Sequence, residues 1–403
     1  MILVFICVII KILRTKNGRQ NILDYSQKTK RTLLSAVLIT ALLLSGCSSE
    51  GGRKTPQVSI SSNREIPLES NAQIINSNED IPPESDPQTV VSDPVSDGMS
   101  ISLCGSPSGI GSDNYRQLTI KDGVITISGS IGENGLREIT ASMSKVDLKK
   151  NGSEFTCTIS NGPMLKGYIS VYLEDERGMY SDIRMRFVNG KFEFPNVLGI
   201  AESNLSLVSG EISKDAKGIT LKNITESGTA DNAEKVLEEI RKISDEICSG
   251  TDSDYEKLRL ISRWVSSNIY YDHDAYSAGI PQACLSLEYM LKNNRSVCGG
   301  YANMTAALAQ AQGITCYSIA GEAVTNQSCY AEVSKGEVHE WNYAVIDGRG
   351  IWVDSGWNSN NHYRKGKYSD DTYGTKYFDI GNEYFALNHK ALRISDRNFF
   401  GIS

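Results

Sequence analysis

The chain has 403 residues, enough for two ordinary domains with extensions, and it carries a net charge of −7 with a pI near 5.4. Its body shows no block of clustered lysines and arginines, so nucleic acid is not expected as a partner, because phosphate binding requires such clusters. What the nine cysteines do depends on whether the compartment is oxidising or reducing.

The N-terminal extension, residues 1–47, has the layout of a secretory signal peptide. Basic residues precede an apolar run from Leu33 to Leu44 that is too short to span a bilayer. An earlier apolar stretch, residues 1–14, lies upstream of this complete signal, which suggests that the true start of translation lies after it.

The apolar run ends in Leu44-Ser45-Gly46-Cys47, which resembles the lipobox of bacterial lipoproteins. The resemblance implies cleavage before Cys47 and attachment of a diacylglyceryl group to its thiol. Acyl chains buried in the bilayer would then hold the protein at the extracytoplasmic face of the cell membrane. A plain signal peptide and a lone anchor helix are the alternatives.

Residues 48–110 are predicted to form a disordered linker. Ser, Asn, Glu and Pro dominate up to about residue 100, aromatic residues are absent there, and six of the ten prolines lie between Pro56 and Pro94. Such a segment buries too little apolar surface to offset the entropy lost on ordering. It would serve as a tether between the membrane anchor and the folded domains.

Residues 111–225 are predicted to form an antiparallel β-sandwich. Short alternating or apolar runs follow one another at close spacing, and two pairs of them flank Asp122-Gly123 and Asn189-Gly190, which are hairpin dipeptides. No residue of this region stands out as catalytic, so it is expected to act as a spacer or binding module.

Helical periodicity begins with the third folded segment, residues 230–403. Asp231 is a candidate cap for a helix that ends near Gly250, and its apolar face is expected to carry Val236, Ile240, Ile243 and Ile247. Ser253 and Glu256 then form a plausible capping box for a second helix. Both helices lead toward a cysteine in an unusual position.

That cysteine, Cys298, falls in the predicted first turn of a helix that Ser296 would cap and Gly313 would end. Backbone N–H groups at a helix start carry partial positive charge, which favours a thiolate and can stabilise an oxyanion. Gly299 and Gly300 leave access to it open. This is a position suited to a nucleophile, although a buried inert thiol is the default for a lone cysteine.

A base and an orienting acid are predicted on the following strands. His339 and Asp354 lie on two strand-like segments joined at Asp347-Gly348, a hairpin dipeptide. A two-residue loop places Trp341 opposite Asp354, which makes Asp354 a diagonal neighbour of His339 on one face. Cys298, His339 and Asp354 can therefore serve as nucleophile, base and orienter in acyl transfer through a thioester.

At these residues the sequence resembles the transglutaminase-like superfamily. The matching blocks, in the family's order, are SVCGGYANMTAALAQAQGI, HEWNYAVI and WVDSGW, with a weaker match at Ile269-Tyr270-Tyr271-Asp272. The resemblance covers about residues 235–390 and implies a papain-like α+β core with a Cys-His-Asp triad. Two departures, Ser296 before the cysteine and Ser355-Gly356 after the aspartate, remove no catalytic side chain.

The second oxyanion donor is left open among three residues. Papain-like relatives use a Gln and transglutaminases a Trp upstream of the cysteine, which makes Gln282, Trp264 and Tyr271 the candidates. Trp264 is also explained by packing within its helix. Trp341 and Trp357 are expected to wall the site rather than react.

The remaining histidines, His273, His362 and His389, are expected to be surface or structural residues because no partner motif accompanies them. Four histidines without close pairing also make a metal site unexpected, and no cofactor is predicted. Six cysteines remain after the doubtful Cys7, the lipidated Cys47 and Cys298 are set aside. An extracytoplasmic setting permits disulfides among them, with fifteen possible connectivities.

The sequence thus predicts an α+β protein: an antiparallel β-sandwich followed by a papain-like catalytic core, in a membrane-anchored lipoprotein. The leading hypothesis is a peptidase or amidase acting on peptide or protein amides, with cell-wall peptide a candidate substrate. A protein cross-linking transglutaminase and a non-catalytic peptide- or wall-binding module are the alternatives.

Overall fold

The structure is a computed structural model that describes residues 98–401 except 142–143, 161–166, 189–190, 196, 211–217, 325–334 and 396–397. The expected signal peptide, Cys47 and most of the expected linker lie outside the described residues. Within the described part, no helix is both long enough and apolar enough to cross a membrane.

The N-terminal half of the described chain is built almost entirely of strands. Its elements are β1 (Met99–Cys104), η1 (Ser112–Asn114), β2 (Arg116–Lys121), β3 (Val124–Ser130), β4 (Glu138–Ala141), β5 (Ser144–Lys145), β6 (Asp147–Asn151), β7 (Glu154–Ser160), β8 (Gly167–Glu174), β9 (Tyr180–Val188), β10 (Lys191–Glu193) and α3 (Leu198–Ser209).

These strands form two antiparallel layers, one with the order β1-β2-β3-β7-β6 and the other β10-β9-β8-β4-β5. Alternate side chains of each layer point into a shared core: Ile125 and Ile127 from one layer and Val171 and Met185 from the other are all fully buried. The predicted sandwich is therefore present. One boundary differs, because β1 occupies residues assigned to the linker, and buried Ile101 and Leu103 explain why that segment is ordered.

The second half carries the helices. Its elements are α4 (Leu221–Ile224), α5 (Ala230–Cys248), α6 (Asp254–Asn268), β11 (Tyr270–Asp272), α7 (His273–Ser277), η2 (Gln282–Leu285), α8 (Leu287–Asn293), β12 (Arg295–Ser296), α9 (Cys298–Ala311), β13 (Thr315–Ala323), β14 (Glu337–Ile346), β15 (Arg349–Val353), α10 (Ser355–Asn358), β16 (His362–Arg364), β17 (Lys367–Ser369), β18 (Phe378–Ile380), α11 (Asn382–Phe385) and β19 (His389–Ser395).

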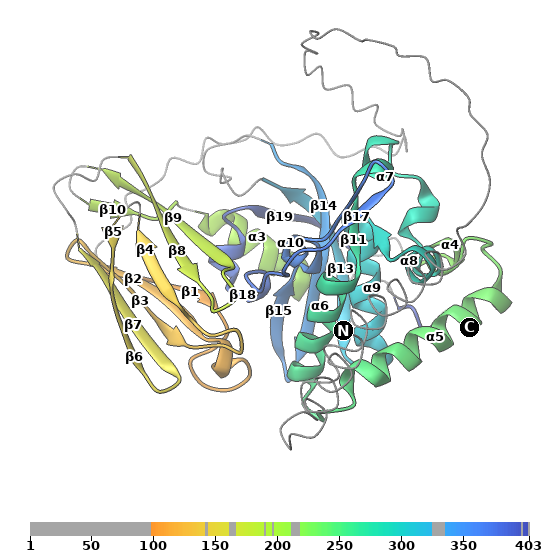
Figure 1. The fold of residues 1–403 in the computed structure, drawn as a ribbon, viewed down its shortest axis with the longest axis horizontal. Coiled ribbons are helices and arrows are strands. Elements are labelled where there is room, and N and C mark those ends of the chain that lie inside the picture. The colour runs from red at the N-terminus through yellow and green to blue at the C-terminus, as the bar shows by residue number, and fades with distance from the viewer. Residues whose placement is uncertain are drawn as a thin grey trace, which may run out of the picture. The chain divides into compact units, whose positions relative to one another are not determined.

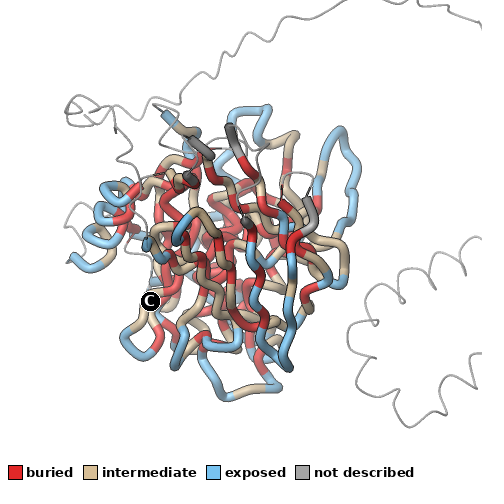
Figure 2. The backbone as a smooth tube through the Cα atoms, turned by 90° about the vertical axis from the view of Figure 1, so that its left-hand side faces the viewer, coloured by how far each residue is buried: buried red, intermediate tan, exposed pale blue. Residues whose placement is uncertain are grey.

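One ten-stranded sheet runs through both halves in the order β19-β13-β14-β15-β18-β1-β2-β3-β7-β6. Helices α5, α6 and α9 pack together and α9 contacts β13 and β14 (Figure 1). Together with strand residues such as Ala344 and Ile351 they form one apolar core, while Trp341 and Trp352 belong to the core shared with the sandwich. Buried residues fill the interior of the described part, and exposed ones gather on loops and outer helix faces (Figure 2). The architecture is α+β, as predicted.

Both helix starts predicted before the cysteine are close to the observed ones. Helix α5 begins at Ala230, and its N-cap is Thr229. Asp231, the predicted cap, lies in the first turn of the helix instead. Ser253 caps α6 by accepting a hydrogen bond from the Glu256 N–H at 3.4 Å. Thr229 and Asp231 are both ordinary choices for a helix start, which is why the residue pattern did not separate them.

The hairpins follow the predicted turn chemistry where they are described. Asp122 and Gly123 have φ values of 50° and 72°, and Asp347 and Gly348 have values of 48° and 77°. Positive φ at both central residues matches the right-handed twist of the flanking strands, which is why such turns favour Asp-Gly. Ile346 pairs with Arg349 across the second loop, as a two-residue loop requires. The Asn189-Gly190 pair lies outside the described residues.

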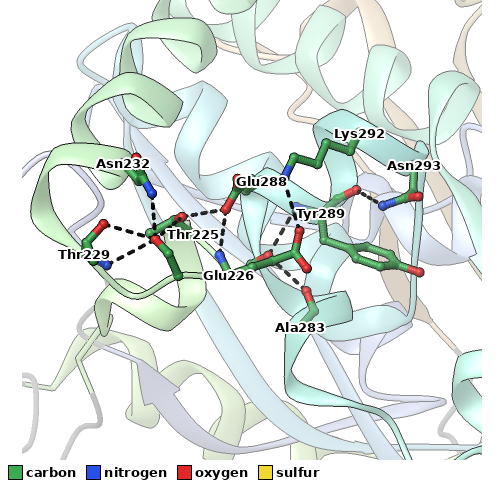
Figure 3. Close-up of polar contacts among 11 residues, drawn as sticks. Thr225, Glu226, Thr229, Asn232, Ala283, Glu288, Tyr289, Lys292 and Asn293 are labelled. Carbon is green, nitrogen blue, oxygen red and sulfur yellow. Dashed lines mark hydrogen bonds and ion pairs between the residues drawn. The ribbon is translucent and has the colours of Figure 1, made fainter.

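A polar cluster fixes α8, the helix that precedes the cysteine segment, to α4 (Figure 3). The Glu288 carboxylate accepts hydrogen bonds from the Thr225 hydroxyl and from the Glu226 N–H at 2.8 Å, and Lys292 lies 2.7 Å from its other oxygen. The ammonium of Lys292 and the hydroxyl of Thr225 lower the pKa of Glu288 to about 2. The carboxylate thus links two segments 63 residues apart in the chain.

We expect Glu288→Gln to lower the free energy of unfolding at pH 7 by about 1 kcal/mol, because charge-assisted hydrogen bonds are lost. The folded pKa lies below the usual value of 4.5, so the stabilisation is complete above pH 4.5 and disappears as the pH falls toward 2. Urea unfolding at pH 7 and at pH 3 measures the change.

Glu238→Gln is the matched control, since Glu238 pairs with Lys242 on α5 at 3.0 Å but both side chains are largely exposed. It should leave the free energy of unfolding nearly unchanged, because water screens an exposed ion pair. Equal effects of the two substitutions would show that Glu288 is only another surface ion pair.

Candidate active site

Cys298 is the first residue of α9, as the sequence predicted, and its side chain is only partly buried. The first intrahelical donor is the N–H of Gly300, which bonds the Val297 carbonyl at 3.0 Å. The N–H groups of Cys298 and Gly299 precede it and point outward from the helix start. They are therefore placed to favour a thiolate and to bind an oxyanion beside it.

Ser296 is not the N-cap, contrary to the prediction. Val297 occupies that position and makes no side-chain cap, because the Ser296 hydroxyl donates instead to the Cys284 carbonyl at 2.5 Å. This bond ties the turn before the cysteine to η2. It also places Ser296 so close to Gly300 that an added Cβ there would lie 1.9 Å from the hydroxyl oxygen. Only glycine at position 300 lets the turn at Ser296 pack this closely against α9.

The His339 ring lies between the cysteine and the aspartate. Its Nε2 is 2.6 Å from Asp354 Oδ2, and the Cys298 side chain is close enough to the ring to raise its pKa. Only 7% of His339 is exposed. The three predicted residues are therefore gathered in the order that nucleophile, base and orienter require.

Asp354 is held at the junction of β15 and α10. It ends the strand and caps the short helix, accepting a hydrogen bond from the Trp357 N–H at 2.9 Å on Oδ1, while Oδ2 faces His339. The carboxylate is 1% exposed. Both carboxylate oxygens of Asp354 thus face donors that the fold holds in place, the Trp357 N–H and the His339 ring.

The electrostatics favour an ion pair between the two residues. Burial alone would lower the pKa of His339, but the Asp354 charge and hydrogen bond and the Cys298 sulfur raise it to about 10. Burial alone would raise the pKa of Asp354, yet the charge and hydrogen bond of His339 hold it well below the usual range. At neutral pH His339 is therefore an imidazolium paired with the Asp354 carboxylate.

Two tryptophans wall the imidazole, as expected. The rings of Trp341 and Trp357 lie 5.8 and 5.2 Å from that of His339. They exclude water from one side of the ion pair and so strengthen it.

His389 is the residue that sequence reasoning missed. Its Nε2 lies 3.2 Å from Asp354 Oδ2, and it is fully buried, so the expectation that it has no partner in the site was wrong. It lies on β19, which reaches the site through its pairing with β13. A separation of 35 residues from Asp354 leaves no local spacing that could reveal this contact.

The prediction that the histidines are not closely paired was also wrong, because they form close pairs in the folded structure. His273 and His362 lie 3.1 Å apart on the exposed side, and ligand atoms of His339, Asp354 and His389 all lie within 4.8 Å of one another. His339 and Asp354 lie 2.6 Å apart, which fits a hydrogen bond. Neighbouring ligand atoms on a tetrahedral zinc ion lie roughly 3.3 Å apart, so these two atoms are too close to share such an ion.

Of the three candidates for the second oxyanion donor, Tyr271 lies close enough to Cys298 for that side chain to affect its pKa. Burial raises the pKa of Tyr271, and the charge of the neighbouring Cys298 raises it further. Trp264 packs against the helical core and Gln282 is exposed at the start of η2. The position thus favours the Tyr271 hydroxyl, which donates while it keeps its proton.

All six cysteines within the described residues are free thiols, so no disulfide joins any two of them. They are Cys104, Cys157, Cys248, Cys284, Cys298 and Cys316. Cys329 lies outside the described residues. Burial raises the pKa of Cys157 and Cys284 to about 11 and of Cys104 and Cys316 to about 12, so these thiols are unreactive near neutral pH.

Comparison with known proteins agrees with this geometry. The model of the transglutaminase-like superfamily matches residues 241–356, which hold Cys298, His339 and Asp354, so the chain contains a transglutaminase-like core domain. The kyphoscoliosis peptidase of Mus musculus is 28% identical over 162 residues, which is 39% of this chain and 22% of that protein. The human kyphoscoliosis peptidase is 30% identical over 149 residues, 36% of this chain and 21% of that protein.

The chain thus spans about a fifth of the length of these curated relatives. Among solved structures, a transglutaminase described as a TGase aligns at 14% identity with a TM-score of 0.28, covering 59% of this chain and 51% of that one.

We expect Gly300→Ala to destabilise the protein by about 1–3 kcal/mol, because the new methyl group overlaps the Ser296 hydroxyl. Ser296→Gly removes the obstacle, so the double variant should recover part of the loss, a non-additive result. Urea unfolding measures it. A Gly300→Ala protein as stable as the unsubstituted chain would contradict the close approach.

Iodoacetamide should alkylate Cys298 selectively at pH 6.5, and His339→Gln should slow the reaction about tenfold or more. Without the imidazolium, the sulfur loses the neighbouring positive charge that makes a cysteine reactive. Peptide mapping and mass spectrometry measure the rate. Cys157 and Cys284 are internal controls, and labelling of either as fast as Cys298 would count against activation.

Proposed function

We propose that the transglutaminase-like domain catalyses thiol-dependent acyl transfer on peptide or protein amides, with hydrolysis as the outcome. The observation that carries the proposal is that His339, bonded through Nε2 to the buried Asp354 carboxylate at 2.6 Å, also lies close enough to Cys298 for that side chain to raise its pKa. A buried ion pair contributes little to stability, and an apolar contact would stabilise the fold at least as well. Stability alone therefore does not explain this arrangement.

In the first half of the reaction the Cys298 thiolate attacks the carbonyl carbon of the amide. Negative charge moves to the carbonyl oxygen, where the N–H groups at the start of α9 and the Tyr271 hydroxyl stabilise it. As the C–N bond breaks, the imidazolium of His339 gives its proton to the leaving amine. A thioester on Cys298 and a neutral imidazole remain.

In the second half a water molecule gives a proton to His339 and adds to the thioester. Collapse of this adduct breaks the C–S bond, releases the carboxylic acid and restores the thiolate–imidazolium pair. Asp354 keeps its charge throughout and stabilises the imidazolium each time it forms.

Hydrolysis is favoured over cross-linking because water is abundant outside the cell. The site is proposed to act at the extracytoplasmic face of the cell membrane, with the chain anchored through a lipid on Cys47 and cell-wall peptide among its possible substrates. Nucleic acid is not proposed as a partner, since the chain is acidic. The similarity to the kyphoscoliosis peptidases, which are named as peptidases, supports the hydrolytic choice.

Fluorescein-labelled casein and dansylated cadaverine separate the candidate activities. We expect peptide release from casein, little incorporation of the labelled amine, and loss of both with Cys298→Ala, because no other described thiol lies at the triad. Cys157→Ala, in the sandwich, is the matched control. A vinyl-sulfone peptide probe followed by peptide mapping should mark Cys298.

Efficient amine incorporation by the wild-type protein would instead identify a cross-linking transglutaminase. Full casein cleavage by the Cys298→Ala protein would contradict the proposed mechanism. Binding of wall peptide that is unchanged in that variant, with no turnover by the wild-type protein, would support the non-catalytic binding module.

A further inference from the structure

Two imidazoles meet on one oxygen of Asp354. Oδ2 lies 2.6 Å from Nε2 of His339 and 3.2 Å from Nε2 of His389, while Oδ1 accepts the Trp357 N–H. His339 takes part in the proposed reaction itself, whereas His389, whose ring lies 5.7 Å from that of His339, has no role in the steps above. His389 is fully buried and contacts the carboxylate of the proposed triad, so its presence there needs an explanation.

We infer that His389 is a positioning residue for this reaction, donating its Nε2–H to Asp354 and holding the carboxylate ionised and correctly turned beneath His339. The inference rests on the proposed acyl transfer and adds a fourth residue to its machinery. It concerns the orientation of Asp354, because nothing places His389 in contact with a substrate.

The neighbours of His389 determine which of its nitrogens carries the proton. In the structure Nδ1 lies 2.7 Å from Oδ1 of Asn388, and Nδ2 of the same amide donates to the Tyr377 hydroxyl at 2.9 Å. A half-turn of the amide exchanges its oxygen and nitrogen at the same separations. Only one of the two orientations suits a neutral imidazole that faces a carboxylate.

In that orientation every donor meets an acceptor. The Tyr377 hydroxyl donates to the Asn388 oxygen, the Asn388 N–H donates to Nδ1 of His389, and Nε2–H donates to Asp354. This orientation requires the half-turn of the Asn388 amide, because with Oδ1 at Nδ1 a neutral ring carries its proton on Nδ1 and turns the lone pair of Nε2 toward the carboxylate, which is repulsive. The chain of bonds therefore has a direction, and it ends on the catalytic aspartate.

The surroundings keep His389 neutral, so its tautomer matters. Burial lowers its pKa to about 4, with His339 and Lys376 lowering it and Asp354 opposing them. The ring stacks on Phe385 at 4.1 Å between centroids. An imidazole fixed in this way donates to Asp354 across the neutral pH range without competing for the charge on His339.

The cost of losing this donor follows from the burial of Asp354. A carboxylate in an apolar site stays ionised only through the donors and charges around it. Without His389, Asp354 would be more easily protonated and freer to turn about its Cβ–Cγ bond. Both changes weaken its hold on the imidazolium that protonates the leaving amine.

Nitrogen-15 NMR of the full chain with labelled histidine tests the direction of the chain, because only four histidines contribute signals. We expect His389 to be neutral and protonated on Nε2 between pH 5.5 and 8. Assignment uses the spectrum of the His389→Gln protein, which lacks its signals. Protonation on Nδ1 alone, or an imidazolium over that range, would overturn the inference.

Two near-isosteric variants test the positioning role. His389→Gln keeps an N–H close to the place of Nε2, whereas His389→Met keeps the length without a donor. With labelled casein we expect His389→Met to lower kcat about tenfold at unchanged KM, as loss of a hydrogen bond to a charged group implies. His389→Gln should restore most of it. Equal kcat for the two variants, high or low, would assign His389 to packing alone.

A readout without substrate keeps the inference separate from the proposed function. The Nε2–H resonance of His339 should remain sharp in the His389→Gln protein and exchange faster with water in the His389→Met protein. An unchanged resonance in both would overturn the positioning role. A sharp resonance with the expected tautomer but no casein turnover would count against the proposed function only.

Discussion

The buried contact between His339 and Asp354 is the interaction on which the active site depends. Each group alone would be destabilised in its charged form by burial, and each keeps its charge only because the other lies 2.6 Å away. The fold has to supply this contact within a few tenths of an ångström. The β14–β15 hairpin does so, because its two-residue turn sets the register that brings the end of β15 next to the start of β14.

The parts of the structure that follow from local chemistry could be predicted from the sequence. The Asp347-Gly348 turn fixes a register, and that register alone brought His339 and Asp354 to the same place; the helix start at Cys298 follows from the pattern after it. Ser296 failed as a cap because its hydroxyl has a competing acceptor, the Cys284 carbonyl, twelve residues away in the chain. Capping rules weigh only neighbours in sequence, so they could not find that acceptor.

Contacts between distant segments account for the rest of what was missed. His389 reaches Asp354 only after β19 has joined the edge of the sheet beside β13, and no residue spacing encodes the order of strands in a sheet. The same holds for β1. Its sequence MSISLC alternates polar and apolar residues, and its place in the sheet is set by β2 on one side and by β18, where Cys104 lies opposite Ile380, on the other.

The place of β1 in the sheet has a consequence for the boundary between the two halves of the protein. Leu103 and Gly105 exchange backbone hydrogen bonds with Gly381 and Asp379 around β18, which in turn lies next to the strand that ends at Asp354. A catalytic half cut free at residue 225 would present β18 as an open edge, ready to pair with a second molecule. The strand domain is therefore not a detachable module; it closes the flank of the sheet that supports Asp354.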